Sequence, residues 1–544
     1  MSVTSEVHDA PHAGHLVRSV GFYGLLFVSL GSIIGSGWLL GALNAAELAG
    51  PASILAWFLA ALMLGLLALV YAELGATYPV AGAGGRFSYY SHGNVAGFTS
   101  GWASWLQAVF IAPIEVLACV EYSNSTAWMQ DHFNMLNSDG FLNTRGYIVS
   151  IALMLIFMAM NLAGAEFMSE SNSYVVLWKF AVPVLAILVV ATLQFDGGNF
   201  TAGGGFMPHG MHGVFAALTG GVVFATQGFE QAVQFAGEAR NPRRDISRAI
   251  LIAMLLGAVL YSALQIALIG AVEPSHVLHN WDNPLGGLSS NVGAWYTLAV
   301  AVGAGWLAKV ILVDAVISPA GTGVVYLGTT ARLSYALGEE DEMPAALART
   351  SPKGVPVISI LLATVIGCIA FGPFPSWQSL VSAVTGATAV MYGMAPIALG
   401  ALRSADADRP RTYQVPFPGF VLPASFASAN LILYFGGFDT MYKVIGALVL
   451  GLALFAIGSS RARTSELKMI KHALWVPAWL VGMLVISALG RYGDSQLNVL
   501  PSWIDLLVVI VFSCVIYYWA VSQALSPEDV RAQVAHDAHQ LDVV

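Results

Sequence analysis

Apolar runs of membrane-spanning length recur along almost the whole of this 544-residue chain, and they restrict its fold more than any other feature. A helix needs roughly 20 such residues to cross the hydrocarbon core of a bilayer. Only 10% of the residues are charged, whereas a soluble domain usually carries about a quarter. The sequence therefore predicts an all-α polytopic membrane protein with lipid around most of its surface.

We expect fourteen spans, both because of the apolar runs and because the basic residues alternate with them. They are 20–46, 52–72, 94–122, 146–165, 174–194, 212–236, 248–272, 293–335, 355–372, 376–401, 419–437, 441–459, 474–490 and 503–521. The eighth is long for one crossing. Pro319 inside it predicts one helix that bends and continues beyond the membrane.

The basic residues predict the orientation. If the N-terminus is cytoplasmic, seventeen Lys and Arg residues fall on the cytoplasmic side, and only Arg145, Lys443 and Arg491 fall on the other. Positive residues concentrate on the cytoplasmic side of membrane proteins. We therefore expect a bacterial inner-membrane protein with both termini in the cytoplasm.

Several classes of protein are disfavoured. The net charge of −9 and the absence of a basic patch argue against nucleic-acid binding. No metalloprotease, serine hydrolase or P-loop motif occurs in a cytoplasmic or interfacial segment, so we do not expect an enzyme. The three cysteines are scattered in apolar runs, which is typical of inert thiols rather than of disulfides or a metal site. We expect no cofactor and no metal.

The first span contains glycines in the middle of an apolar run, at Gly31, Gly35 and Gly37. Each weakens a helix by roughly 1 kcal/mol relative to alanine. Irregular backbone at membrane depth is tolerated where it lines a cavity or is buried in protein. An unwound segment at Ile34, Gly35, Ser36 and Gly37 would bind the substrate, because it directs free amides and a helix N-terminus at a carboxylate. Close helix packing through Gly31 and Gly35 is the structural alternative.

The sixth span is interrupted in the same way, by Gly220, Gly221 and Gly228. Five spans separate it from the first, so the two run in opposite directions through the membrane. Interrupted helices at matching positions of two inverted halves are the best sequence indication of a transporter's central site. We expect this segment to contribute substrate-binding groups, with Phe224 closing over the solute, at Phe224, Ala225, Thr226, Gln227 and Gly228.

These segments resemble the amino acid–polyamine–organocation superfamily of transporters. The resemblance rests on Gly31 to Gly37, on Gly228-Phe229-Glu230, on Gly237-Glu238-Ala239-Arg240-Asn241-Pro242 and on Arg332 to Leu337. Within this superfamily the chain resembles bacterial aspartate–proton symporters most. The motifs that carry this resemblance include 70–76, 90–93, 305–308, 312–319, 373–377 and 516–520.

The resemblance implies a LeuT-like five-plus-five inverted-repeat fold. The first repeat would cover 20–194 and the second 212–401, followed by four additional spans in 419–521. Residues 1–19 and 522–544 would form cytoplasmic tails.

Ionisable residues at membrane depth are expensive and therefore functional candidates. Lys179 resembles the lysine that replaces a bound cation in the fifth span of related transporters. Because burial disfavours an ammonium, it could lose and regain a proton during transport; the alternative is a side chain that extends to the interface. Asp314, with Ser318 one turn away, is the second candidate for proton coupling, or else a structural ion-pair partner of Lys179 or Lys309.

Lys309 is a secondary candidate. It could bind a second substrate carboxylate or pair with Glu115 of the third span. Glu115 and Glu121 are expected to belong to polar networks rather than to bind substrate, and Glu230 to cap or pair locally.

The sequence thus predicts a secondary transporter: a proton-coupled amino acid symporter, with L-aspartate or L-glutamate as the specific expectation. Its partners would be the amino acid, protons and the lipid bilayer. A neutral or cationic amino acid or polyamine importer or exchanger on the same fold is the alternative. A channel is disfavoured because the polar residues cluster at two helix breaks.

Overall fold

The computed structural model describes residues 20–80, 83–163, 165–286, 293–339, 343–351, 355–458, 470–493, 495–501 and 503–536. Within these ranges the chain is helical, and extended backbone pairs only in two isolated bridges, Val20 with Ala239 and Leu136 with Leu142. The expected all-α fold is confirmed. The N-terminal tail 1–19 and the last residues of the C-terminal tail lie outside the described residues.

The long helices follow the predicted spans closely, because each apolar run is terminated by polar or Gly and Pro residues. The unbroken ones are α3 (Ser53–Thr77), α5 (Asn94–Ser123), α7 (Thr144–Leu162), α8 (Ala165–Leu193), α12 (Pro242–Ala271), α14 (Gly305–Glu339), α15 (Val357–Ala370), α16 (Trp377–Ala405), α17 (Pro418–Phe435), α18 (Gly437–Gly458), α20 (Trp475–Leu489) and α21 (Ile504–Ser522).

The spans expected to break do so. Span 1 forms α1 (Phe22–Ile33) and α2 (Gly37–Ala49), and span 6 forms α9 (Gly210–Ala217), η3 (Leu218–Val222), α10 (Val223–Thr226) and α11 (Gln231–Gln234). The prediction that the eighth span, 293–335, is a single helix is wrong. Its first part is a separate α13 (Ala294–Ala301), and Gly303, with φ +77°, lies between it and α14.

Eleven helices of the described residues are long and apolar enough to cross a membrane, and three shorter apolar helices accompany them. The broken spans account for part of the difference from fourteen, because each half is too short to count alone. Fourteen crossings therefore stays a prediction, whereas a multi-pass membrane protein is established by the helices.

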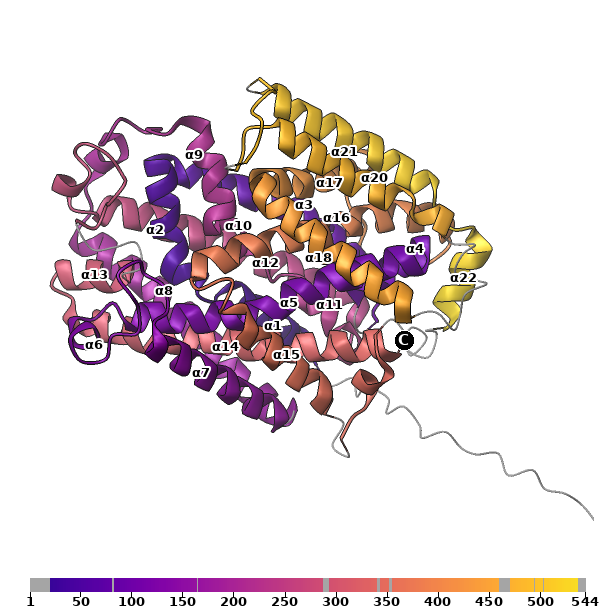
Figure 1. Cartoon of the computed structure of the whole chain (residues 1–544), viewed down its shortest axis with the longest axis horizontal. Coiled ribbons are helices and arrows are strands. Elements are labelled where there is room, and N and C mark those ends of the chain that lie inside the picture. Colours follow the sequence, from indigo (N-terminus) through magenta and orange to yellow (C-terminus); the bar gives the residue numbers. More distant parts are fainter. Residues whose placement is uncertain are drawn as a thin grey trace, which may run out of the picture.

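Several of the long helices, such as α5 and α14, run along the long axis of the molecule, which therefore has two ends (Figure 1). We call the end with α6 (Ala127–His132), α9 and α13 the outer end, and the end with α4 (Ala83–His92) and α22 (Pro527–His536) the inner end. Helix α14 packs along α5, α12 along α3, and α17 along α16. The C-terminal helices α17 to α21 thus cover one side of the bundle.

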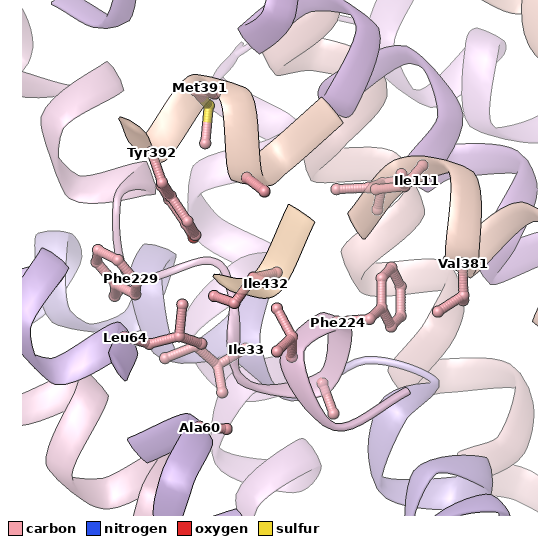
Figure 2. Packing of buried hydrophobic residues seen from close by; sticks show 14 of the residues in the cluster. Ile33, Ala60, Leu64, Ile111, Phe224, Phe229, Val381, Met391, Tyr392 and Ile432 are labelled. Carbon is pink, nitrogen blue, oxygen red and sulfur yellow. The ribbon is translucent and has the colours of Figure 1, made fainter. Parts of the chain in front are cut away.

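Buried apolar side chains fill the space around the two breaks (Figure 2). They come from α1, α3, α5, α10 and α16, and include Ile33, Leu64, Ile111, Phe224 and Met391. The breaks therefore lie at the centre of the core, where free backbone groups need partners within the protein.

Candidate functional site

The first break removes one turn of helix between α1 and α2. Ile34 adopts φ −91° and ψ 84°, outside the helical region, and Ser36 is the N-cap of α2. A break creates two new helix ends, whose last carbonyls and first amides lack intrahelical partners. The carbonyl end attracts cations and the amide end attracts anions.

The structure has a carboxylate at the amide end. Glu115 of α5, almost fully buried, accepts a hydrogen bond from the backbone N–H of Ser36 on Oε2 at 2.8 Å. The backbone N–H of Gly35 donates to the carbonyl of Ile33 at 3.2 Å. The backbone N–H groups of Gly35 and Ser36, in the segment predicted to direct free amides at a carboxylate, therefore already have acceptors within the protein. Glu115 thus takes part in a hydrogen-bond network at the break, whereas the expectation that it does not bind substrate stays a prediction.

The structure has an ammonium at the carbonyl end. Lys179 of α8 is 1% exposed and donates from Nζ to the carbonyl of Gly31 at 2.5 Å and to Oγ1 of Thr322 at 2.6 Å. Thr322 of α14 also donates to the Gly31 carbonyl, at 3.0 Å. Lys179 does not extend to the interface. It lies between the first and eighth spans.

Asp314 has neutral partners. Its Oδ2 accepts from Nε1 of Trp38 at 3.0 Å, and its Oδ1 accepts from the hydroxyl of Ser318 at 2.6 Å. Among the described residues it forms no ion pair within 4.0 Å, so the expected pairing with Lys179 or Lys309 is not found. The carboxylate connects α14 to α2, just beyond the break.

The structure contradicts both roles expected for Lys309. This lysine lies in the first turns of α14 with an exposed side chain, whereas Glu115 is buried at the break. The two form no ion pair, and Lys309 is not among the residues that line the central cavity. Its position near a helix end explains why an apolar span tolerates it, since a flexible stem lets the ammonium reach water.

The second break brings the sixth span against the first. Gly228, with φ +115°, lies so close to α1 that a Cβ there would meet the backbone of Ser32 at 2.8 Å. At Gly37 a Cβ would lie 2.5 Å from the Cβ of Ala225. Ser29 also donates to the carbonyl of Phe229, at 2.9 Å. Glycine is needed at 228 and 37 because two backbones touch there.

A cavity of about 10 Å³ remains at this crossing, close to the least space that holds one water molecule. Five of the predicted binding residues line it: Gly35, Gly37, Phe224, Ala225 and Gln227. Ile34, Ser36, Thr226 and Gly228 do not, although they belong to the same breaks. The hydroxyl of Thr226 instead donates to the carbonyl of Val222.

The amide of Gln227 is the unusual group in this lining. It is buried, yet neither its oxygen nor its nitrogen has a partner among the described residues. A buried amide without hydrogen bonds costs free energy. Its position next to the cavity therefore suits a polar ligand group.

Several residues of the site are not indicated by the sequence. Thr322, Tyr326 and Ile111 line the cavity with Glu115. Thr322 and Tyr326 stand one turn apart on α14, the same helix as Asp314, but nothing in their local sequence distinguishes them from packing residues. Glu230 accepts one local hydrogen bond, of the kind the sequence predicts, and one from a distant helix. Its Oε2 accepts from the N–H of Gly228 at 3.0 Å and from the hydroxyl of Tyr392 at 2.8 Å.

The site offers hydrogen-bond donors, an acid and an ammonium, but no metal centre. No cluster of three or more His, Cys, Asp or Glu side chains that could hold a metal ion occurs in the part of the chain that the structure describes. The arrangement can bind and release a small polar solute and move protons between buried groups.

Comparison with known proteins agrees with this geometry. The family model described as amino acid permease matches residues 20–455. The glutamate/serine transporter AimA of Bacillus subtilis (strain 168) is 34% identical over 520 residues, covering 95% of this chain and 96% of the relative. The aspartate-proton symporter of the same organism is 30% identical, with 93% and 96% covered. The branched-chain amino acid permease BcaP is 24% identical. The chain therefore belongs to the amino acid permease family and is a transporter rather than an enzyme.

Proposed function

We propose that this permease is a proton-coupled symporter of L-aspartate or L-glutamate, in the inner membrane of a bacterium. The observation that carries the proposal is the position of Lys179. Its ammonium joins the open carbonyl end of α1 to Thr322 of α14, across the first break. Two relatives whose names include glutamate and aspartate, one of them a proton symporter, support the substrate and the coupling ion.

The physical basis is the cost of a buried charge. With its proton, Lys179 donates to the carbonyl of Gly31, which also accepts from Thr322, and strengthens the contact of α1 with α14. Without that proton, the amine loses one donor and its charge, so the contact between the two helices weakens. If the solute and the proton favour the same conformation, each raises the affinity for the other, which is the reciprocity that symport requires. We infer that Asp314 and Glu115 are the nearby acids that exchange protons with this group.

The two interrupted spans would then belong to two inverted halves, 20–194 and 212–401, with both termini in the cytoplasm. Reporter fusions after Asn137 and after Ala407 test the topology, with periplasm expected for the first and cytoplasm for the second. Two reporters on the same side would contradict it.

Uptake into proteoliposomes with an imposed pH gradient tests the coupling. Lys179→Ala is expected to keep exchange but lose accumulation, and Lys179→Arg to fail as well, because a guanidinium does not deprotonate in this range. Lys309→Ala is the matched control, since that lysine is exposed, and it should accumulate solute normally. Accumulation that needs sodium and ignores the pH gradient would contradict the proposal.

One observation favours a second candidate, a neutral polar amino acid such as serine. No Lys or Arg lines the cavity, which contains the acid Glu115 and the amide of Gln227. A second substrate carboxylate would therefore meet no cation in this lining. Competition by aspartate, glutamate, serine, lysine and polyamines separates the candidates. Serine competing more strongly than aspartate would replace the acidic substrate with a neutral one.

A further inference from the structure

Trp377, the first residue of α16, contacts both broken helices from the outer side. Its indole Nε1 donates to the hydroxyl of Ser36 at 2.8 Å, at the start of α2. Its ring lies edge-to-face with Phe224, with centroids 5.7 Å apart, and a Cβ at Gly221 would meet it at 3.2 Å. The side chain is 1% exposed. One aromatic ring thus holds span 1 and span 6 together.

The backbone of Trp377 is held by a carboxylate. Glu121 of α5, itself buried, accepts from the N–H of Trp377 on Oε1 at 2.8 Å. This N–H is one of the donors at the start of α16 that have no acceptor within the helix itself, and a negative group is favoured at this helix end. A chain of hydrogen bonds therefore begins at Glu115, passes through Ser36 and Trp377, and returns to the same helix α5 at Glu121.

This chain lies between the cavity and the outer end. Phe224 lines the cavity, and Trp377 stands behind it without lining the cavity itself. The segment just before α16 is tied to the outer end, because the hydroxyl of Tyr147 at the start of α7 donates to the carbonyl of Phe371. A route from the outer end to the cavity that runs between α2 and the sixth span therefore passes Trp377, which contacts both.

We propose that Trp377 is the outer gate of the solute site and that Glu121 is its positioning residue. The inference rests on the proposed function, because a gate requires a transported solute. In the closed state the indole joins Ser36 to Phe224. Opening needs the indole N–H to leave Ser36 and the ring to leave Phe224, after which α2 and the sixth span can separate. Glu121 acts through Trp377 by setting where α16 begins.

Directional cysteine labelling tests the gate without solute or proton gradient, so its result is independent of the transport assay. Cys119, Cys368 and Cys514 are replaced by alanine, and Ile111→Cys, on the cavity wall, reports access by a membrane-impermeant thiol reagent. A separate Ser138→Cys variant, on an exposed loop of the outer end, identifies which side the reagent reaches.

Trp377→Phe is expected to speed labelling of Ile111→Cys about five- to tenfold from the side that labels Ser138→Cys, and not from the other side. Loss of one buried hydrogen bond shifts a two-state equilibrium by about that factor. Ser36→Ala removes the hydroxyl that accepts from the indole N–H and should give the same rise, and combining both changes should add little. Trp479→Phe is the matched control, because its indole bonds Asn430 among the C-terminal helices.

Glu121 has its own pair of variants. Glu121→Ala should also raise labelling from the outer side, whereas Glu121→Gln should restore the closed state, because an amide oxygen still accepts the N–H of Trp377. Unchanged labelling in both Trp377→Phe and Ser36→Ala would overturn the proposal, and so would an equal rise from the two sides. A rise in Glu121→Gln as large as in Glu121→Ala would remove Glu121 as the positioning residue.

Discussion

The two ends of helix α16 are held by different interactions. On the outer side, Trp377, Ser36 and Phe224 meet through a neutral hydrogen bond and an aromatic edge. On the inner side, the buried carboxylate of Glu73 on α3 forms ion pairs with Arg403 and Arg411, at the end of α16 and just beyond it. Its Oε2 also accepts from the backbone N–H of Val415 at 2.6 Å.

The difference indicates which part of the molecule moves. A single neutral hydrogen bond contributes about 1 kcal/mol, so it can break and form again in every cycle. Separating a buried carboxylate from two guanidinium groups costs several kcal/mol. We infer that the Glu73 cluster keeps α3 and α16 together at the inner end, while the outer contacts of α16 change.

The largest loss of stability is expected from a substitution in this inner cluster. Glu73→Ala removes the carboxylate that pairs with two arginines and accepts from the amide of Val415, and should destabilise the protein by about 3–5 kcal/mol. The measurement is the fraction of monodisperse protein in detergent after heating. Glu273→Ala removes an exposed carboxylate beside His276 and should change nothing. Equal stability of the two variants would show that the inner ion pairs are not a fixed connection.

A smaller effect is expected at Gly221 on the outer side. Its φ of +142° is a conformation that alanine rarely adopts, and a Cβ there would meet the ring of Trp377 at 3.2 Å. Gly221→Ala should cost about 1–3 kcal/mol. Gly65→Ala, in α3 with open space around it, should be neutral or slightly stabilising in the same heating assay. A loss at Gly65 as large as at Gly221 would contradict the argument from backbone strain.

Ser36→Ala tests the outer side of the comparison, because it removes the hydroxyl that accepts from Trp377 and keeps the backbone N–H that donates to Glu115. The expected cost is about 1 kcal/mol, well below that of Glu73→Ala. Ser382→Ala is a suitable control, since that hydroxyl bonds only the carbonyl of Gln378 in its own helix. Unfolding in detergent as severe as that of Glu73→Ala would mean that the outer side is as fixed as the inner side.

The smallest effect is expected at the edge of the inner end. Arg531 of α22 lies 3.4 Å from Asp408, and both side chains are largely exposed. Solvent-exposed ion pairs contribute little, so Asp408→Ala should change stability by less than about 0.5 kcal/mol. The same heating assay applies. A loss of several kcal/mol would extend the fixed inner cluster to the C-terminal helix.

The sequence by itself determined the features that depend on one segment. Apolar runs predicted twelve unbroken helices and two broken ones, because helix formation in lipid depends mainly on the length and composition of a run. Glycines located both breaks, and the cost of a buried charge singled out Lys179. The eighth span was the exception, since Gly303 divides it, whereas α14 continues past Pro319 as predicted.

Only the tertiary structure decided which side chains meet. Glu115 and Lys309 both interrupt apolar helices, yet one lies buried at the break and the other is exposed. Trp377 and Thr322 contact the first span from more than 280 residues away in the sequence. Such contacts depend on how each helix is rotated about its axis and packed against its neighbours. In an apolar helix the side that faces lipid and the side that faces protein have similar residues, so the sequence does not distinguish them. The local pattern therefore determines where a helix forms or breaks, and packing determines what the broken ends bind.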